Sequence, residues 1–152
     1  MFVKIFAMTV NEPAAEYLSL HREYKRAEHL GGLKLIHLSR EGIRMDNLRH
    51  LRERTGLDLP AFARILQITP RTLQNKEASD NLGVSVSEKA LELAMLFARG
   101  VDVFGNHDRF ISWMRKPCRA LENERPLDLL DTRFGFDAVT QVMGRMEHGV
   151  IS

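Results

Sequence analysis

Residues 57–79, "LDLPAFARILQITPRTLQNKEAS", decide the fold, because they place two short helices on either side of a tight turn. Asp58 can cap the first helix, and Thr69 followed by Pro70 forms a strong pair of N-cap and first-turn residues for the second. The small or apolar positions expected to pack between the helices are Ala63, Ile68 and Leu73. This pattern predicts a helix-turn-helix.

Gln67 occupies the turn site that most often carries glycine in such motifs. The turn requires a positive φ, and a residue with a Cβ atom costs on the order of 1 kcal/mol in that conformation. A folded domain tolerates this cost, so the prediction of a helix-turn-helix stands.

The second helix carries short, polar side chains that can form hydrogen bonds, and such a helix enters the major groove with its N-terminal residues nearest the base edges. Arg71 is suited to guanine, and Gln74 or Asn75 to adenine. The predicted phosphate contacts are Thr69, Thr72 and Lys76. The same spacing also fits a helical hairpin whose polar residues only face water, and this alternative stays open.

The segments around the motif are also predicted to be helical. Between Gly42 and Gly56 the apolar residues recur at three-residue spacing, which predicts a short amphipathic helix ending at a glycine. Residues 84–100 begin with Ser85 and Glu88 at capping-box spacing and end at Gly100. Their apolar residues cover most of the circumference, so this helix is expected to be buried and to join two halves of the protein.

Two further helices are expected near the C-terminus. Pro126 fits the first turn of a short helix that stops near Thr132, and the helix in residues 136–149 is capped by Gly149. Apolar residues at helical spacing usually serve packing. The expected core residues of this part are Trp113, Leu127, Leu130, Val139 and Val142, and Met143 and Met146 continue the stripe.

Composition indicates a soluble globular protein, and the helical patterns described above make its expected fold class all-α. The 152 residues are 44% apolar and 28% charged, with a net charge of +2 that permits nucleic-acid binding without establishing it. The single cysteine fits the reducing cytoplasm, and neither a signal peptide nor a membrane span is expected. Residues 14–32 are predicted to form a helix closed by Gly31 and Gly32, and residues 2–10 fit a short strand that would pair with another copy.

Catalysis and metal binding receive no support from the sequence, so no cofactor is expected. His21 and His29, with Glu16 and Glu28 nearby, match no metal motif. Cys118 and His107 could be imagined as nucleophile and base, but neither lies in a recognisable local signature. The glycines are scattered and form no phosphate-binding loop.

From about residue 35 to 150 the chain resembles the Xre/MbcA/ParS antitoxins of type II toxin-antitoxin systems. The most specific parts stand in one order: "VDVFG" at 101–105, Trp113, Pro117, "RPLDLLDT" at 125–132, Gly135 and Gly149. The resemblance implies an Xre-like helix-turn-helix domain at 33–100 and a small helical toxin-binding domain with a C-terminal tail at 101–152. Residues 1–32 would be an N-terminal extension that is helical or forms dimer contacts.

The resemblance further implies that the chain neutralises a RES-domain toxin. Such toxins are similar to ADP-ribosyltransferases and consume NAD, and the antitoxin would cover the active site. It would also bind operator DNA as a homodimer or within a larger toxin-antitoxin complex, repressing its own operon. The toxin-facing residues carried over by position are Arg115, Lys116, Gln141, Arg145, His148, Gly149, Val150 and Ile151. The alternative is a stand-alone helix-turn-helix transcription regulator without a toxin partner.

Overall fold

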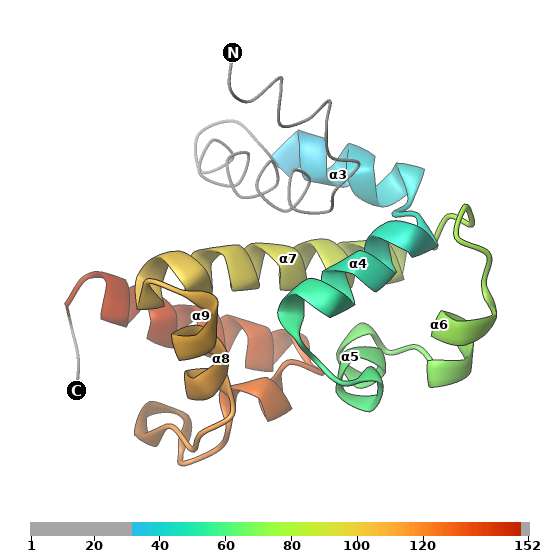
Figure 1. Cartoon of the computed structure of the whole chain (residues 1–152). Helices are drawn as coiled ribbons and strands as arrows, with labels where there is room; N and C mark the ends of the chain where they lie inside the picture. Colours follow the sequence, from blue (N-terminus) through green and yellow to red (C-terminus); the bar gives the residue numbers. More distant parts are fainter. Residues whose placement is uncertain (1–31, 150–152) are drawn as a thin grey trace.

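The computed structural model describes residues 32–149, and these residues form an all-α fold, as predicted (Figure 1). The α-helices are α3 Gly32–Glu41, α4 Met45–Thr55, α5 Leu59–Leu66, α6 Pro70–Asn75, α7 Val84–Phe104, α8 His107–Met114 and α9 Arg133–Glu147, with 3-10 helices η1 Arg119–Leu121 and η2 Pro126–Leu129. The only β-type pairing in this part of the chain is one antiparallel bridge between Arg44 and Asn81.

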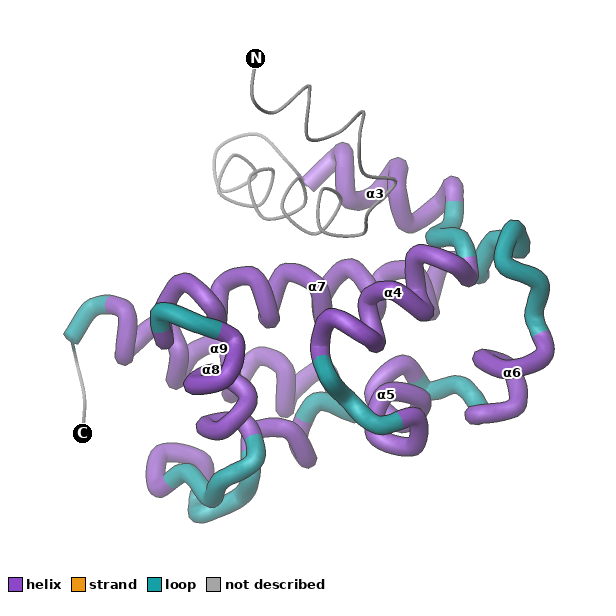
Figure 2. The backbone as a smooth tube through the Cα atoms, in the orientation of Figure 1, coloured by secondary structure: helices purple, strands orange, loops and turns teal. Residues whose placement is uncertain are grey.

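Helix α7 runs through the centre of the molecule and contacts α3, α4, α5, α8 and α9 (Figures 1 and 2). It is longer than predicted, because Gly100 does not end it. Gly100 lies buried inside the helix, and a Cβ atom there would come within 2.3 Å of the Phe110 ring. The glycine therefore serves close packing of α8 on α7. The predicted capping box is also wrong, since Gly83 is the N-cap residue and makes no side-chain cap bond.

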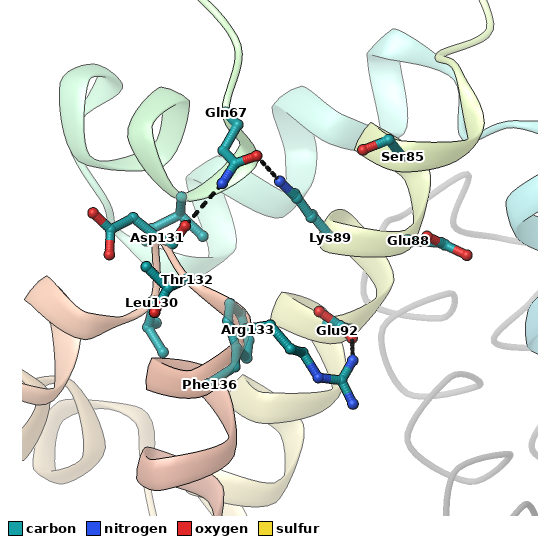
Figure 3. A pocket seen from close by; sticks show the side chains of 11 residues that line it. Gln67, Ser85, Glu88, Lys89, Glu92, Leu130, Asp131, Thr132, Arg133 and Phe136 are labelled. Atoms are coloured by element: carbon teal, nitrogen blue, oxygen red, sulfur yellow. Dashed lines mark hydrogen bonds and ion pairs between the residues drawn. The ribbon is translucent and has the colours of Figure 1, made fainter.

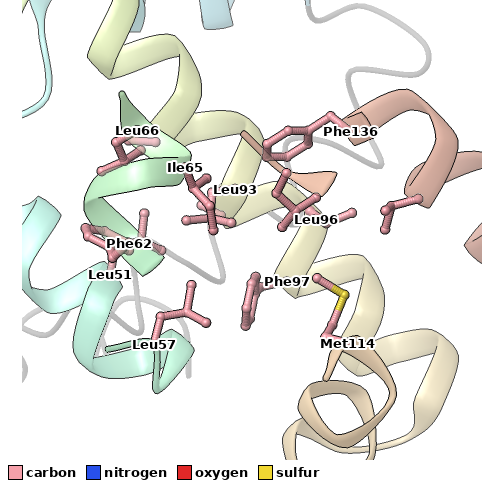
Figure 4. Close-up of a cluster of buried hydrophobic side chains, with 14 of the residues drawn as sticks. Leu51, Leu57, Phe62, Ile65, Leu66, Leu93, Leu96, Phe97, Met114 and Phe136 are labelled. Carbon is pink, nitrogen blue, oxygen red and sulfur yellow. The ribbon is translucent and has the colours of Figure 1, made fainter. Parts of the chain in front are cut away.

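One hydrophobic cluster joins the first and second halves of the described chain (Figure 4). Phe62 and Leu66 enter it from α5, Phe97 from α7, Met114 from α8 and Phe136 from α9. Of the predicted core residues, Leu130, Val139 and Val142 are buried, whereas Trp113 and Leu127 are half-buried and pack against the cluster. Because α7 crosses residue 100 without a break, both halves share a helix and a core.

The local signals around the predicted turn are confirmed. The Asp58 carboxylate accepts a hydrogen bond from the Ala61 amide at 2.8 Å, and the Thr69 hydroxyl accepts one from the Thr72 amide at 3.1 Å. Gln67 has a φ of 55°, as expected for this turn, and α4 ends at Gly56 with a φ of 66°. Helix α6 is shorter than expected and ends at Asn75 rather than near Glu77.

The C-terminal helices form where they were predicted, with one additional helix, but α9 starts at Arg133 rather than Phe136 and its C-cap residue is His148 rather than Gly149. The Thr132 hydroxyl accepts a hydrogen bond from the Gly135 amide at 3.0 Å and starts α9, while Gly149 with a φ of 73° follows its end. The addition is α8, which the Asn106 side chain caps by accepting from the Arg109 amide at 2.9 Å. An Asn–His–Asp start is a cap signal that the sequence analysis did not use.

Some expectations lie outside the described residues: the strand over 2–10, the helix over 14–31 and the tail residues Val150 and Ile151. Gly32, expected to close a helix, is the first residue of α3 instead. Within 32–149 no helix is both long and apolar enough to cross a membrane.

Candidate functional site

The six residues predicted to bind DNA lie together on α6 and its two ends. Arg71, Gln74 and Asn75 are exposed, while Leu73 between them is buried, so the helix turns its polar face outward. Thr69 is exposed, and Thr72 and Lys76 are half-buried. The hydroxyls of Thr69 and Thr72 are 2.9 Å apart and share a hydrogen bond. The geometry thus presents a compact, hydrogen-bonding surface one helix wide.

Arg49 on α4 holds the far end of α6, which the sequence analysis missed. Its guanidinium donates to the Lys76 carbonyl at 2.6 Å and to the Leu73 carbonyl at 3.2 Å. Carbonyls at the end of a helix have no partner within the helix, so a charged donor there stabilises the helix end. Arg49 lies among several arginines between residues 40 and 54. Their spacing alone does not show which of them contacts another helix. Arg44, for example, pairs locally with Asp46 at 2.6 Å.

A groove of about 470 Å³ separates α4 from α6. Its lining consists of Arg49, Arg52, Glu53, Leu59, Leu73 and Gln74. Arg52 and Gln74 therefore face a common space, and a cationic side chain lies beside the predicted base-reading residue. This placement extends the candidate DNA-binding surface from α6 onto α4.

Polar bonds tie the α5–α6 turn to the segment that precedes α9 (Figure 3). The Gln67 amide donates to the Asp131 carbonyl at 2.9 Å and accepts a hydrogen bond from Lys89 on α7. Arg64 donates to the Asp128 carbonyl at 3.0 Å and lies 3.4 Å from the Asp131 carboxylate. The residue that occupies the strained turn position thus also helps to bridge the two halves, through side-chain bonds that glycine could not make.

The cavity beside this bridge has a volume of about 260 Å³ and contains charges of both signs (Figure 3). Glu92 on α7 pairs with Arg133 on α9 across it. Burial raises the pKa of the Glu92 carboxyl above its usual value, although the Arg133 guanidinium opposes this shift. The pair links α9 to α7 near the start of α9.

The predicted toxin-facing residues fall into two groups that belong to different elements. Gln141, Arg145, His148 and Gly149 are exposed on the outer face and end of α9. Arg115 and Lys116 are exposed at the end of α8, where the Arg115 guanidinium donates to the Gly56 carbonyl at 3.4 Å. Arg115 therefore contacts the α4–α5 link rather than α9.

No candidate metal site is found in residues 32–149. These residues hold no group of three or more histidine, cysteine or acidic side chains that could bind a metal ion. His107 starts α8, where its ring packs beside Phe97. Cys118 is half-buried before η1, packed against the hydrophobic cluster. The structure gives these two residues separate packing roles.

The C-terminal part of the chain is similar to a described protein family. Residues 99–149 match the family described as "Antitoxin Xre/MbcA/ParS C-terminal toxin-binding domain". This range covers the end of α7, α8, both 3-10 helices and all of α9.

Curated relatives extend the similarity to most of the chain. Two proteins named "Antitoxin Xre" are similar: one from Photorhabdus laumondii is 34% identical over 67 residues, covering 43% of this chain and 45% of that protein. The other, from Yersinia enterocolitica, is 27% identical over 142 residues, covering 92% of this chain and 95% of that protein. A "Prs ADP-ribosylating antitoxin" from Sphingobium sp. is 27% identical over 140 residues, covering 85% and 87%.

A solved structure shares the fold. It is the M. tuberculosis MbcT-MbcA toxin-antitoxin complex, with a TM-score of 0.51 and 24% identity over 69% of this chain and 94% of the matched chain. Together with the family match and the curated relatives, it confirms the resemblance to the Xre/MbcA/ParS antitoxins.

Proposed function

We propose, from the confirmed resemblance to Xre/MbcA/ParS antitoxins, that this chain binds and neutralises a toxin through residues 101–152. The observation that carries this proposal is the match of residues 99–149 to a toxin-binding domain, combined with the outward face of α9. That face is rich in exposed polar groups and is not used for packing within residues 32–149. A helix held firmly by its buried side is well suited to present the opposite side to a partner.

The toxin we propose is a RES-domain protein that consumes NAD by ADP-ribosyltransferase-like chemistry. The name of the Sphingobium relative, which refers to ADP-ribosylation, supports this class. The chain would act without catalysis of its own, by covering the toxin's active site. The end of α9 and the residues after it, including Val150 and Ile151, would reach toward that site.

We further propose that α6 binds operator DNA and that the chain represses its own operon. The polar face of α6, its caps and the adjoining groove with Arg52 support this assignment. Two copies would place two such helices on a palindromic operator, one DNA turn apart. Replacing Arg71 by Ala should weaken operator binding by about 1–3 kcal/mol if Arg71 reads a guanine. Unchanged binding would remove Arg71 from the set of base-reading residues.

Helix α6 and the C-terminal end of α9 lie at opposite ends of the molecule (Figure 1). This arrangement favours an antitoxin that holds DNA and toxin at the same time. The alternative function is that of a stand-alone transcription regulator, which would also bind DNA through α6 but would have no protein partner.

Co-expression of this chain with a RES-domain toxin tests the main proposal. We expect growth arrest and NAD loss with the toxin alone, and normal growth and NAD with both proteins. We expect a chain lacking Val150, Ile151 and Ser152 to rescue less well while binding the operator normally. Failure of the full chain to form a complex with the toxin, combined with tight operator binding, would favour the stand-alone regulator.

A further inference from the structure

The outer face of α9 carries a continuous exposed stripe that begins with an aromatic residue. Phe134 in the first turn is 87% exposed, the highest value among the large exposed apolar side chains of residues 32–149. Further exposed residues follow Phe134 along the same side of α9, at spacings of three and four residues. We define the α9 stripe as Phe134, Asp137, Gln141, Arg145 and His148.

The stripe points away from the protein's own core. Val139, Val142 and Met143 of the same helix are buried, and they lie on the opposite side at helical spacing. Phe134 therefore cannot reach the hydrophobic cluster, whereas its neighbour Phe136 is part of it. A helix position that faces only water usually carries a polar residue, so packing within residues 32–149 does not explain the aromatic ring of Phe134.

Charges around Phe134 are neutralised inside the chain. Arg133 pairs with Glu92 and lies 3.3 Å from the Asp137 carboxylate. A partner covering Phe134 would thus meet a ring flanked by ion-paired groups rather than by free charges. Aromatic residues are enriched at the centres of protein interfaces, and polar groups form the rim around them.

The other end of the stripe is positive. Glu147 is held by Arg99 at 3.0 Å, while Arg145 makes no ion pair within residues 32–149. With a rise of about 1.5 Å per residue, Arg145 lies about 16 Å along the helix from Phe134. The surface that fits this stripe has an apolar pocket at one end and acidic groups about 16 Å away.

We propose that the α9 stripe is the main docking surface for the toxin and that Phe134 is its hydrophobic anchor. The inference rests on the proposed function and adds a residue and a partner surface to it. The toxin is the occupant rather than a second copy of this chain, because the entire stripe lies within the segment that matches a toxin-binding domain. The stripe also ends at His148, where the proposed tail begins.

The test is the affinity of the full chain for the purified RES-domain toxin, measured by calorimetry, with wild type and two variants. Phe134→Ala should weaken binding about 30-fold, which corresponds to the loss of an interface hot spot. Val84→Ala is the matched control, since Val84 is an exposed apolar residue of α7, outside the stripe, and 47% exposed. It should leave the affinity unchanged. Because Phe134 is exposed, its replacement should not alter the unfolding temperature.

The outcomes separate the two proposals. A wild-type chain that does not bind the toxin overturns the proposed function and the inference together. Wild-type binding with equal affinity for Phe134→Ala overturns the inference alone. If Phe134→Ala instead converts a dimer into a monomer in sedimentation and leaves toxin affinity unchanged, the stripe is a contact between copies and the inference is wrong. Operator binding should be the same for all three proteins.

Discussion

Helices α6 and α9 begin in the same way but are held in place by different forces. Each starts with a threonine whose hydroxyl accepts a hydrogen bond from the amide three residues on, at 3.1 Å for Thr69 and 3.0 Å for Thr132. Helix α6 has six residues, of which Leu73 is buried, whereas α9 has fifteen and buries Gly135, Phe136, Val139, Val142 and Met143.

The difference indicates how each surface is positioned. Helix α6 depends on polar bonds from other elements, chiefly those from Arg49 to the carbonyls of Leu73 and Lys76. Helix α9 depends on its own apolar face and on close packing at its first turn. Polar substitutions should therefore disturb α6 selectively, while steric changes in the core should disturb α9 and the whole fold.

The largest effect is expected for Gly135→Ala. A Cβ atom at this position would lie 1.7 Å from the Leu129 carbonyl oxygen, which belongs to the backbone and cannot rotate away. We expect the free energy of unfolding to fall by about 3 kcal/mol, in the upper part of the range for overpacked sites.

Chemical denaturation of Gly135→Ala and Gly83→Ala makes the comparison. Gly83 has nothing within 4 Å of the added atom and a φ of −63°. Alanine is a poorer N-cap than glycine but loses less backbone entropy on folding, so this replacement should change stability by less than about 1 kcal/mol. Equal stability of the two variants would show that α9 is not held by close packing at its start.

Arg49→Ala should have the next largest effect and should act on α6. Hydrogen bonds from a charged donor contribute about 1.5–3 kcal/mol, and their loss leaves the carbonyls at the end of α6 without this partner. We expect a loss of stability of about 1–2 kcal/mol and weaker operator binding, with toxin affinity retained.

Arg54 is an exposed arginine on α4, the helix that carries Arg49, so Arg54→Ala is the matched control for the loss of positive charge. Operator affinity measured by fluorescence anisotropy should fall more for Arg49→Ala than for Arg54→Ala. Equal losses would mean that Arg49 contributes only charge and does not position α6.

Gln67 allows a finer test, because backbone strain and side-chain bonding oppose each other there. Gln67→Gly relieves the positive φ of 55° but removes the bonds to Asp131 and Lys89. Gln67→Ala removes the same bonds but does not relieve the backbone strain, because alanine also has a Cβ atom. Thermal unfolding should show that the free energy of unfolding of the Gln67→Ala variant is about 1 kcal/mol lower than that of the Gln67→Gly variant. Equal stability of the two variants would show that the turn carries no strain.

The smallest effect concerns the pH dependence of stability at Glu92. Burial raises the pKa of this carboxyl in the folded chain, so the folded state binds a proton more tightly than the unfolded state. This group therefore adds stability at pH values below its unfolded pKa, and that contribution is lost as the pH rises through its folded pKa. Glu92→Gln should remove this component from a plot of unfolding free energy against pH. An unaltered plot would contradict the assigned shift.

Local signals in the sequence predicted much of the fold, because caps and turns depend on neighbouring residues. Asp58, Thr69 and Gln67 adopt the expected capping and turn conformations. Gly100 was misread because a glycine in a helix can mark either an end or a close approach, and only the position of Phe110 separates the two. Asn106, the cap of α8, was present as a signal and was not used.

The candidate surfaces were less predictable, since they depend on contacts between distant residues. The sequence located the polar face of α6 and most of the exposed face of α9. It could not reveal that Arg49 reaches α6 from 24 residues upstream of Leu73. Phe134 and Phe136 are both aromatic and only two positions apart, so the exposed one is identified only when the buried side of α9 is known.

We propose that DNA and toxin bind separate surfaces of the protein, on α6 and α9. The most direct test measures both affinities for two variants of the full chain: Arg71→Ala and Phe134→Ala. The probes are DNA from upstream of the operon and the purified RES-domain toxin. We predict that Arg71→Ala weakens operator binding only and that Phe134→Ala weakens toxin binding only. A variant that loses both activities, or two variants that lose neither, would contradict the claim.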